Sequence, residues 1–240
     1  MAMPKPGPAL TVPLTQLLNV FLTSPCPLCD RTSPGGICPS CRKRLEQDRL
    51  SAPLQGLQSP LPVLAWGAYQ GSLRQALGLL KYQHKPALAQ LFGSYLGQCW
   101  QHQHPRLHPS QKKQPIVVPI PLHADKLSQR GFNQAELLAY WFCRLTNLPL
   151  ASQGLVRVRA TQAQHGLGAQ ARQHNLDGAF ALGPAFHHHR PSGPVLLIDD
   201  IYTTGATALS AAQTLRHYGI SVVGISTIAR AMPSAALEQS

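Results

Sequence analysis

Acidic residues are scarce in this chain. Of its 240 residues only 9 are Asp or Glu, against 21 Lys or Arg, and the formal net charge is +12. Such an imbalance favours polyanionic partners: nucleic acid, phosphorylated metabolites or an anionic membrane surface. A generally basic protein without such a partner is the alternative. The basic excess is concentrated between residues 126 and 175, where six Lys or Arg accompany Glu136 alone.

Long apolar runs are also missing. No run approaches the roughly 20 residues that a membrane-spanning helix needs, so we expect no membrane span. The apolar stretch at residues 17–22 is short and contains Asn19, and Pro25 directly before Cys26 makes a poor cleavage or lipidation site. We therefore expect an amphipathic N-terminal helix in a cytoplasmic protein. Hydrophobic residues still make up 44% of the chain, enough for a sizeable core.

Strand-like and helix-like patterns alternate from residue 63 onward. Apolar, often β-branched stretches predict strands at residues 63–69, 116–120, 194–201 and 220–228. Helical spacing of apolar residues predicts helices within residues 73–80, 88–96, 136–144 and 206–218, the last ending at Gly219. This alternation predicts an α/β domain with a largely parallel sheet over residues 63–232.

The remaining segments are assigned from composition. Residues 1–50 contain the predicted helix and four of the six cysteines, residues 51–62 are rich in Pro and Gln and predict a linker, and residues 233–240 form a tail. The His- and Gln-rich tract 101–114 predicts an exposed loop. The run His187-His188-His189 is also interpreted as a solvated loop, with metal binding as the alternative.

Four cysteines occur as two Cys-x-x-Cys pairs: Cys26, Cys29, Cys38 and Cys41. Four thiolates so spaced can surround one tetrahedral ion, which predicts a structural zinc site closed to chemistry. Disulfides are the competing interpretation, disfavoured in a chain without a secretion signal. A thioredoxin-like motif needs a single such pair. Cys99 and Cys143 lie alone in apolar helical stretches and are expected in the core.

The segment VLLIDDIYTTGAT, residues 195–207, ends a predicted buried strand with two adjacent carboxylates, Asp199 and Asp200. Ligands of α/β sheets bind beyond the carboxyl ends of strands. The following loop offers hydroxyls, backbone N–H groups and a helix N-terminus suited to a phosphate monoester, at Thr203, Thr204, Gly205, Ala206 and Thr207. No Gly-Lys-Ser/Thr sequence occurs, so this is not a Walker loop.

Carboxylates repel phosphate but accept hydrogen bonds from vicinal ribose hydroxyls. A ribose 5-phosphate therefore fits both halves of the segment, with its sugar hydroxyls on Asp199 and Asp200 and its phosphate in the Thr/Gly loop. Two helix-capping carboxylates without a ligand are the structural alternative.

This segment resembles the signature of type I phosphoribosyltransferases that binds phosphoribosyl pyrophosphate (PRPP). Further motifs resemble the ComF/GntX family: the four-cysteine module, LLKY at residues 79–82, VPIPL at 118–122, RGFNQAE at 130–136 and GAF at 178–180. Single positions add to this resemblance, namely Arg159, Thr161, Gln162, Gln164, Leu167, Arg172 and Asn175.

The resemblance implies a type I phosphoribosyltransferase fold, a parallel-sheet core with a hood, preceded by a zinc module. It also implies competence, that is, assistance in taking up transforming DNA, with single-stranded DNA and competence-machinery proteins as further partners. Residues 157–178 resemble a mobile hood loop, and Arg130-Gly131 a turn on the pyrophosphate side. Lys81, Arg130 and Arg172 are candidates for neutralising pyrophosphate, each with a solvated surface charge as the alternative. Magnesium would accompany PRPP if the protein is catalytic.

The sequence is compatible with three functions. The first is a ComF-type protein that binds a phosphoribosyl ligand and assists DNA uptake. The second is a phosphoribosyltransferase of nucleotide salvage, which has no need of a four-cysteine module. The third is a nucleic-acid-binding module on a catalytically silent scaffold, favoured by the net charge and by Arg42-Lys43-Arg44.

Overall fold

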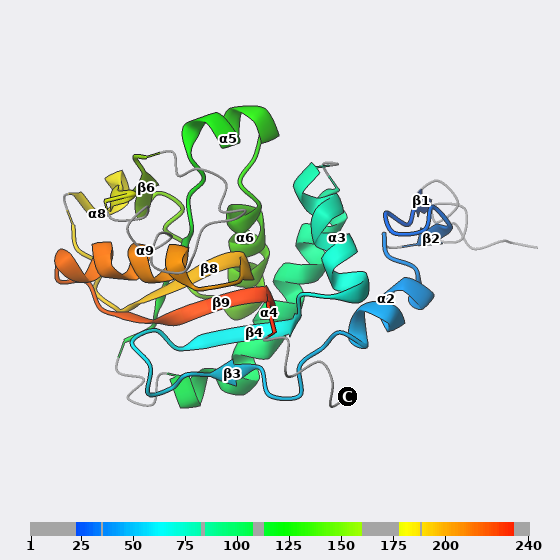
Figure 1. Ribbon diagram of the computed structural model, residues 1–240, viewed down its shortest axis with the longest axis horizontal. Coiled ribbons are helices and arrows are strands. Elements are labelled where there is room, and N and C mark those ends of the chain that lie inside the picture. Colours follow the sequence, from blue (N-terminus) through cyan, green and yellow to red (C-terminus); the bar gives the residue numbers. More distant parts are fainter. Residues whose placement is uncertain are drawn as a thin grey trace, which may run out of the picture.

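A five-stranded sheet forms the centre of the molecule (Figure 1). The computed structural model describes residues 23–34, 36–82, 85–107, 113–159, 178–187 and 189–232. The strand order is β3-β4-β9-β8-β5, in which the last four strands are parallel and β3 is an antiparallel edge strand. The bounds are β3 (Leu54–Gln55), β4 (Val63–Ala68), β5 (Ile116–Pro119), β8 (Val195–Tyr202) and β9 (Val222–Arg230). The predicted α/β class with a parallel-rich sheet is confirmed.

Helices cover both faces of this sheet. On one face α3 (Gly71–Tyr82), α4 (Pro86–Leu107) and α6 (Gln134–Thr146) share a core with Leu196 and Ile198 of β8. On the other face α9 (Ala206–His217) shares a second core with Val195 and Leu197 of the same strand. Successive strand residues point to opposite faces, so an uninterrupted apolar run is what a strand covered on both sides requires.

The predicted loop at residues 101–114 is wrong over its first half. Helix α4 continues to Leu107 and includes Pro105 in its final turn. Trp100 and Leu107 are buried while Gln101 and His102 are exposed, so the polar tract is the outer face of an amphipathic helix. Composition alone did not reveal this because two anchoring apolar residues suffice to bury the inner face. Residues 108–112 lie outside the described part of the chain.

The Pro- and Gln-rich segment predicted as a linker supplies an edge to the sheet. Within residues 51–62, Leu54 and Gln55 form β3 and pair with Leu64 and Val63 of β4. A two-residue edge strand needs few hydrogen bonds and tolerates flanking prolines. For this reason the sequence of the segment shows no pattern that predicts a strand.

Several further small elements were not predicted, and four of them lie beyond residue 120. They are the antiparallel pair β6 (Leu155–Arg157) and β7 (Phe180–Leu182), and the helices α5 (Ala124–Arg130) and α8 (Pro184–His187). Strands and helices this short have too few residues to show the hydrophobic periodicity from which such elements are predicted. His187 ends α8 instead of lying in a loop. The predicted N-terminal helix at residues 17–22, most of the hood segment 157–178 and His188 lie outside the described residues.

The cysteine-rich segment packs against α3 at one end of the molecule (Figure 1). It comprises the hairpin β1 (Thr23–Pro25) and β2 (Thr32–Pro34), followed by α2 (Pro39–Glu46). Leu45 of α2 is fully buried in the core that α3 and α4 share. Asp48 then accepts a hydrogen bond from the backbone N–H of Leu73 at 2.9 Å, which joins the segment to the first turn of α3. In the described residues no helix has both the length and the apolar character needed to cross a bilayer.

Candidate functional site

The two adjacent carboxylates lie at the carboxyl end of β8 and differ in their surroundings. Asp200 is 4% exposed and Asp199 is half-buried. The Asp199 Oδ1 atom accepts a hydrogen bond from the Asp200 backbone N–H at 2.8 Å. The Lys81 Nζ atom, from the last turn of α3, lies 2.8 Å from Asp200 Oδ2. An ion pair therefore connects the carboxyl end of β8 to helix α3.

This pairing has electrostatic consequences. Desolvation, and secondarily the charge of Asp200, raises the pKa of Asp199 well above its ordinary value. Burial by itself would lower the pKa of Lys81, but the carboxylates of Asp200 and Asp199 outweigh it and the net pKa is raised. Asp199 is therefore more easily protonated than an exposed aspartate, whereas Asp200 is paired with Lys81.

The loop after β8 delivers an open helix N-terminus next to these carboxylates. Gly205 is the N-cap of α9 with a φ of +78°, in the left-handed region. A Cβ at this position would lie 2.1 Å from the Tyr202 Oη atom, so glycine is required by both conformation and space. Among the described residues no side chain caps α9, and Thr203 and Thr204 are exposed while Thr207 is half-buried. Uncapped N–H groups with the positive end of the helix dipole form an anion site.

Cations from three other elements lie in this region. The pKa of Lys126 in α5 is lowered by burial and then by the positive charges of Arg157, Arg130 and Lys81, so these three cations lie close enough to act on Lys126. Burial lowers the pKa of Arg157 in β6, and the negative charge of Asp199 only partly offsets this effect. The Arg130 Nη1 atom donates to Gln134 Oε1 at 2.5 Å, and its Cζ lies 5.6 Å from the centre of the Tyr82 ring. Such an arrangement can bind a ligand that carries both hydroxyls and several phosphates.

The four paired cysteines form a second site. Their sulfur atoms all lie within 4.8 Å of one another, and Cys29 Sγ and Cys38 Sγ are 3.6 Å apart. Sulfurs bound tetrahedrally at 2.3 Å would be separated by about 3.8 Å, so the geometry fits a metal ion. All four thiols are free of disulfides.

Local hydrogen bonds shape this cluster. The Cys41 backbone N–H donates to Cys38 Sγ at 3.4 Å and lowers the pKa of Cys38 to about 7, while burial raises the pKa of Cys41 to about 12. The Arg44 Nη2 atom donates to Cys41 Sγ at 3.0 Å. Arg44 therefore contacts the cluster through its guanidinium, although it is exposed like its neighbours Arg42 and Lys43.

The chain is similar to several curated proteins. It is 35% identical to Competence protein F of Haemophilus influenzae over 48% of this chain and 50% of that protein. It is 28% identical to DNA utilization protein YhgH of Escherichia coli over 82% of this chain and 91% of the other. Competence protein ComFC of Bacillus subtilis is 27% identical over 81% of this chain and 72% of its own length. No protein-family model matches the chain.

These relatives support the ComF family. The resemblance drawn from sequence motifs is thereby confirmed. The match to Competence protein F spans only half of that protein, whereas the matches to YhgH and ComFC span most of both chains.

Most of the residues predicted for the ligand site lie together. Asp199, Asp200 and the Thr203–Thr207 loop are contiguous, and Lys81 and Arg130 reach the same region from α3 and α5. Arg172 lies outside the described residues. Sequence reasoning missed Lys126 and Arg157 as site residues, although the basic excess from residue 126 onward was a signal for both. Cys99 and Cys143 contribute to the core as predicted, buried and half-buried respectively.

Proposed function

We propose that the carboxyl end of β8 binds a phosphoribosyl ligand of the PRPP type on a type I phosphoribosyltransferase-like fold. The observation that carries this proposal is the juxtaposition of two unlike groups: the carboxylates of Asp199 and Asp200, and the uncapped N-terminus of α9. A purely phosphate-binding site would exclude the carboxylates, and a cation site would not include the helix N-terminus.

Each half of the site has a part in this proposal. The 5′-phosphate is held by the backbone N–H groups and hydroxyls of Thr203–Thr207. The ribose hydroxyls donate to Asp199 and Asp200. Because Lys81 uses the Oδ2 atom of Asp200, the Oδ1 atom of that carboxylate is the one assigned to the sugar.

The cations around the site suit the pyrophosphate. Lys81, Lys126, Arg130 and Arg157 offset its negative charge, and Arg172 is predicted to join them. If the protein catalyses transfer, the bond from C1 of the ribose to the pyrophosphate oxygen breaks, the pyrophosphate leaves with the electron pair, and a nucleophile bonds to C1. The cations stabilise the leaving charge. If magnesium accompanies PRPP, the carboxylate of Asp199 would be the one available to hold it, since Asp200 is paired with Lys81, and the ion would neutralise part of the pyrophosphate charge.

The four-cysteine cluster is proposed to hold structural zinc. Sulfur donors in a closed tetrahedral set match that ion, and such a set leaves no coordination position for a substrate. Its binding would stabilise a segment that contributes little apolar surface of its own.

We further propose that the protein assists the uptake or use of DNA. The names Competence protein F, Competence protein ComFC and DNA utilization protein YhgH support this role. The net charge of +12 and the exposed Arg42 and Lys43 support affinity for single-stranded DNA, and competence-machinery proteins are the other proposed partners.

Calorimetric titration of the full chain with ribose 5-phosphate and with PRPP tests the ligand proposal. We expect both to bind, and Asp199→Asn and Asp200→Asn each to weaken binding by about tenfold or more, because a charge-assisted hydrogen bond is lost. Thr207→Val should weaken every ligand that carries a 5′-phosphate.

Glu46→Gln is the matched control, since it removes an exposed carboxylate from α2 without touching β8. Absence of heat with both ligands, or equal affinities for Asp200→Asn and Glu46→Gln, would contradict the proposal and leave Asp199 and Asp200 as structural caps.

A further inference from the structure

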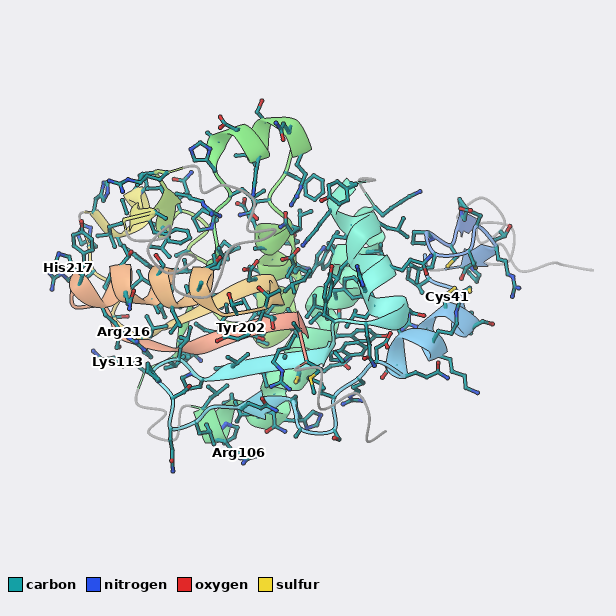
Figure 2. All side chains as sticks on the ribbon, viewed as in Figure 1. Cys41, Arg106, Lys113, Tyr202, Arg216 and His217 are labelled. Atoms are coloured by element: carbon teal, nitrogen blue, oxygen red, sulfur yellow. The ribbon has the colours of Figure 1, made fainter. Side chains whose placement is uncertain are left out.

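A cavity lies at the opposite end of α9 from the acidic strand end. Its volume is about 420 Å³, and its walls come from β7, α8 and the turn after α9: Ala181, Leu182, Phe186, His187, Arg190 and Tyr218. Helix α9 has 12 residues, which separates its two ends by about 18 Å at 1.5 Å per residue. Figure 2 shows the labelled Arg216 and His217 at this end, with Tyr202 nearer the middle of the molecule and Cys41 on the opposite side. The cavity is thus separate from both sites described above.

Two aromatic rings give this cavity flat apolar walls. Phe186 is 5% exposed and packs against Gly154, where even a Cβ would lie 2.8 Å from the ring. Its ring is therefore fixed. Tyr218 is 41% exposed, and its backbone is held because its N–H donates to the Leu215 carbonyl at 3.1 Å. An exposed ring on a fixed backbone and a buried ring in the wall of the same cavity suit a planar ligand.

Polar groups occupy the same walls. The His187 Nε2 atom donates to the Leu182 carbonyl at 2.9 Å, so in the neutral ring the Nδ1 atom is left as an acceptor. The Arg190 guanidinium lies against the turn at Gly219, with Nη1 3.0 Å from the position that a Cβ would take there. Glycine at this position, with a φ of +74°, lets the arginine approach the end of α9.

The described segments that form this end of the molecule carry charge of one sign. Residues 178–187, 189–198 and 201–232 contain no Asp or Glu, while His187, His189, Arg190, Arg216 and His217 all lie in these segments. Arg216 donates to the Pro60 carbonyl at 2.5 Å, which is a neutral acceptor. An anionic group is therefore attracted to this end of the molecule.

We propose that this cavity binds one nucleotide unit, with its base between Tyr218 and Phe186 and its phosphate on Arg190. The volume lies at the small end of ligand pockets, roughly 300–1,000 Å³, and suits a ligand of this size. A simple anion would not need the aromatic walls, and a neutral apolar ligand would not need the arginine. Base stacking together with a positive groove is the way proteins hold single-stranded nucleic acid. The unit can be a free nucleotide or part of a strand.

Titration of the full chain with dTMP and with a 5′-phosphorylated oligo-dT tests this inference. Loss of stacking in Tyr218→Ala should weaken binding roughly fivefold or more, whereas Tyr218→Phe keeps the ring and should bind like the parent protein. Arg190→Gln should weaken binding and reduce its dependence on salt. The matched controls are Tyr140→Ala, a tyrosine of α6 that is 47% exposed, and Arg106→Gln, which lies on another edge of the molecule (Figure 2).

The two probes distinguish the sources. Equal losses for dTMP and the oligonucleotide support a free nucleotide, and a loss confined to the oligonucleotide supports a strand. Effects of Tyr218→Ala and Arg190→Gln no larger than those of Tyr140→Ala and Arg106→Gln would overturn the proposal, as would binding of neither probe. Binding of PRPP should be unchanged in Tyr218→Ala, so this outcome is independent of the fate of Asp199 and Asp200.

Discussion

The four-cysteine cluster and the acidic end of β8 are built in opposite ways. All four thiols come from residues 26–41, and the local turns of a hairpin and one helix start bring them together. The carboxylates of Asp199 and Asp200 meet Lys81 from α3, Lys126 from α5 and Arg157 from β6 only because the sheet is assembled. The spacing of the cysteines along the chain determines the first site, whereas the assembled sheet and its helices determine the second.

This difference predicts that the two sites respond differently to amino-acid substitution. The cysteine segment contributes few buried apolar side chains of its own, so its order should depend on the bound metal. The strand end is framed by two hydrophobic cores, so single changes there should alter binding and stability in graded steps. Four variants separate these behaviours.

Cys38→Ser should have the largest effect. Structural zinc in small domains contributes an apparent binding free energy of about 10–16 kcal/mol, so loss of one ligand should abolish tight metal binding and unfold the segment around residues 23–46. Metal analysis should find less than about half an equivalent of zinc in the variant and about one in the parent. Limited proteolysis should cut the variant in this segment first. Cys143→Ala, a thiol outside the cluster, should keep its metal; a parent protein with reduced thiols and no zinc contradicts the metal proposal.

Lys81→Met should destabilise the fold less, by about 2–3 kcal/mol, because it leaves the buried Asp200 carboxylate without its cation. The value is below that of a fully buried pair since the Lys81 side chain is 21% exposed. Denaturant unfolding measures the change, with Lys43→Met as an exposed control. The double variant Lys81→Met/Asp200→Asn should recover most of the loss. A double variant no more stable than Lys81→Met would show that the loss does not come from the unpaired Asp200 carboxylate.

Gly205→Ala should cost about 1–3 kcal/mol, since the residue would be held at a positive φ with its Cβ against Tyr202. Ribose 5-phosphate binding should fall as well, because the loop must move. Gly78→Ala in α3 is the contrasting control: its Cβ would meet nothing within 4 Å, so the substitution should stabilise the helix by about 0.5–1 kcal/mol. Equal unfolding midpoints for the two variants would be inconsistent with a constrained loop.

Asp199→Asn should have the smallest effect on stability and one that depends on pH. The folded state raises the pKa of Asp199, so it binds more protons than the unfolded state, and this group lowers stability as pH rises above the unfolded pKa of about 4. Asparagine keeps the acceptor for the Asp200 N–H and removes the charge. The variant should therefore be more stable than the parent at pH 7, with the difference vanishing toward pH 3. A difference independent of pH would mean that Asp199 does not titrate differently in the two states.

Sequence patterns located much of the fold, for reasons visible in particular elements. The four apolar residues before Asp199 predicted a strand covered on both faces, and β8 is buried by α4 and α6 on one side and α9 on the other. The end of α4, from residue 101 to Leu107, was predicted as a loop because its outer face is rich in Gln and His. Strand β3 was missed because two residues are too few to show the alternation of apolar and polar side chains that predicts a strand.

By itself, the sequence determined the features whose partners are neighbours in the chain. These are the four cysteines, the two adjacent carboxylates and the Thr/Gly loop, because a fixed spacing along one backbone fixes which groups can converge. Only the tertiary structure decided that Lys81 pairs with Asp200, that Lys126 and Arg157 join them, and that Arg190 and Tyr218 share a cavity. Those contacts join residues far apart in the chain, and they form only when burial of the sheet between its helices supplies the free energy to hold such distant segments together.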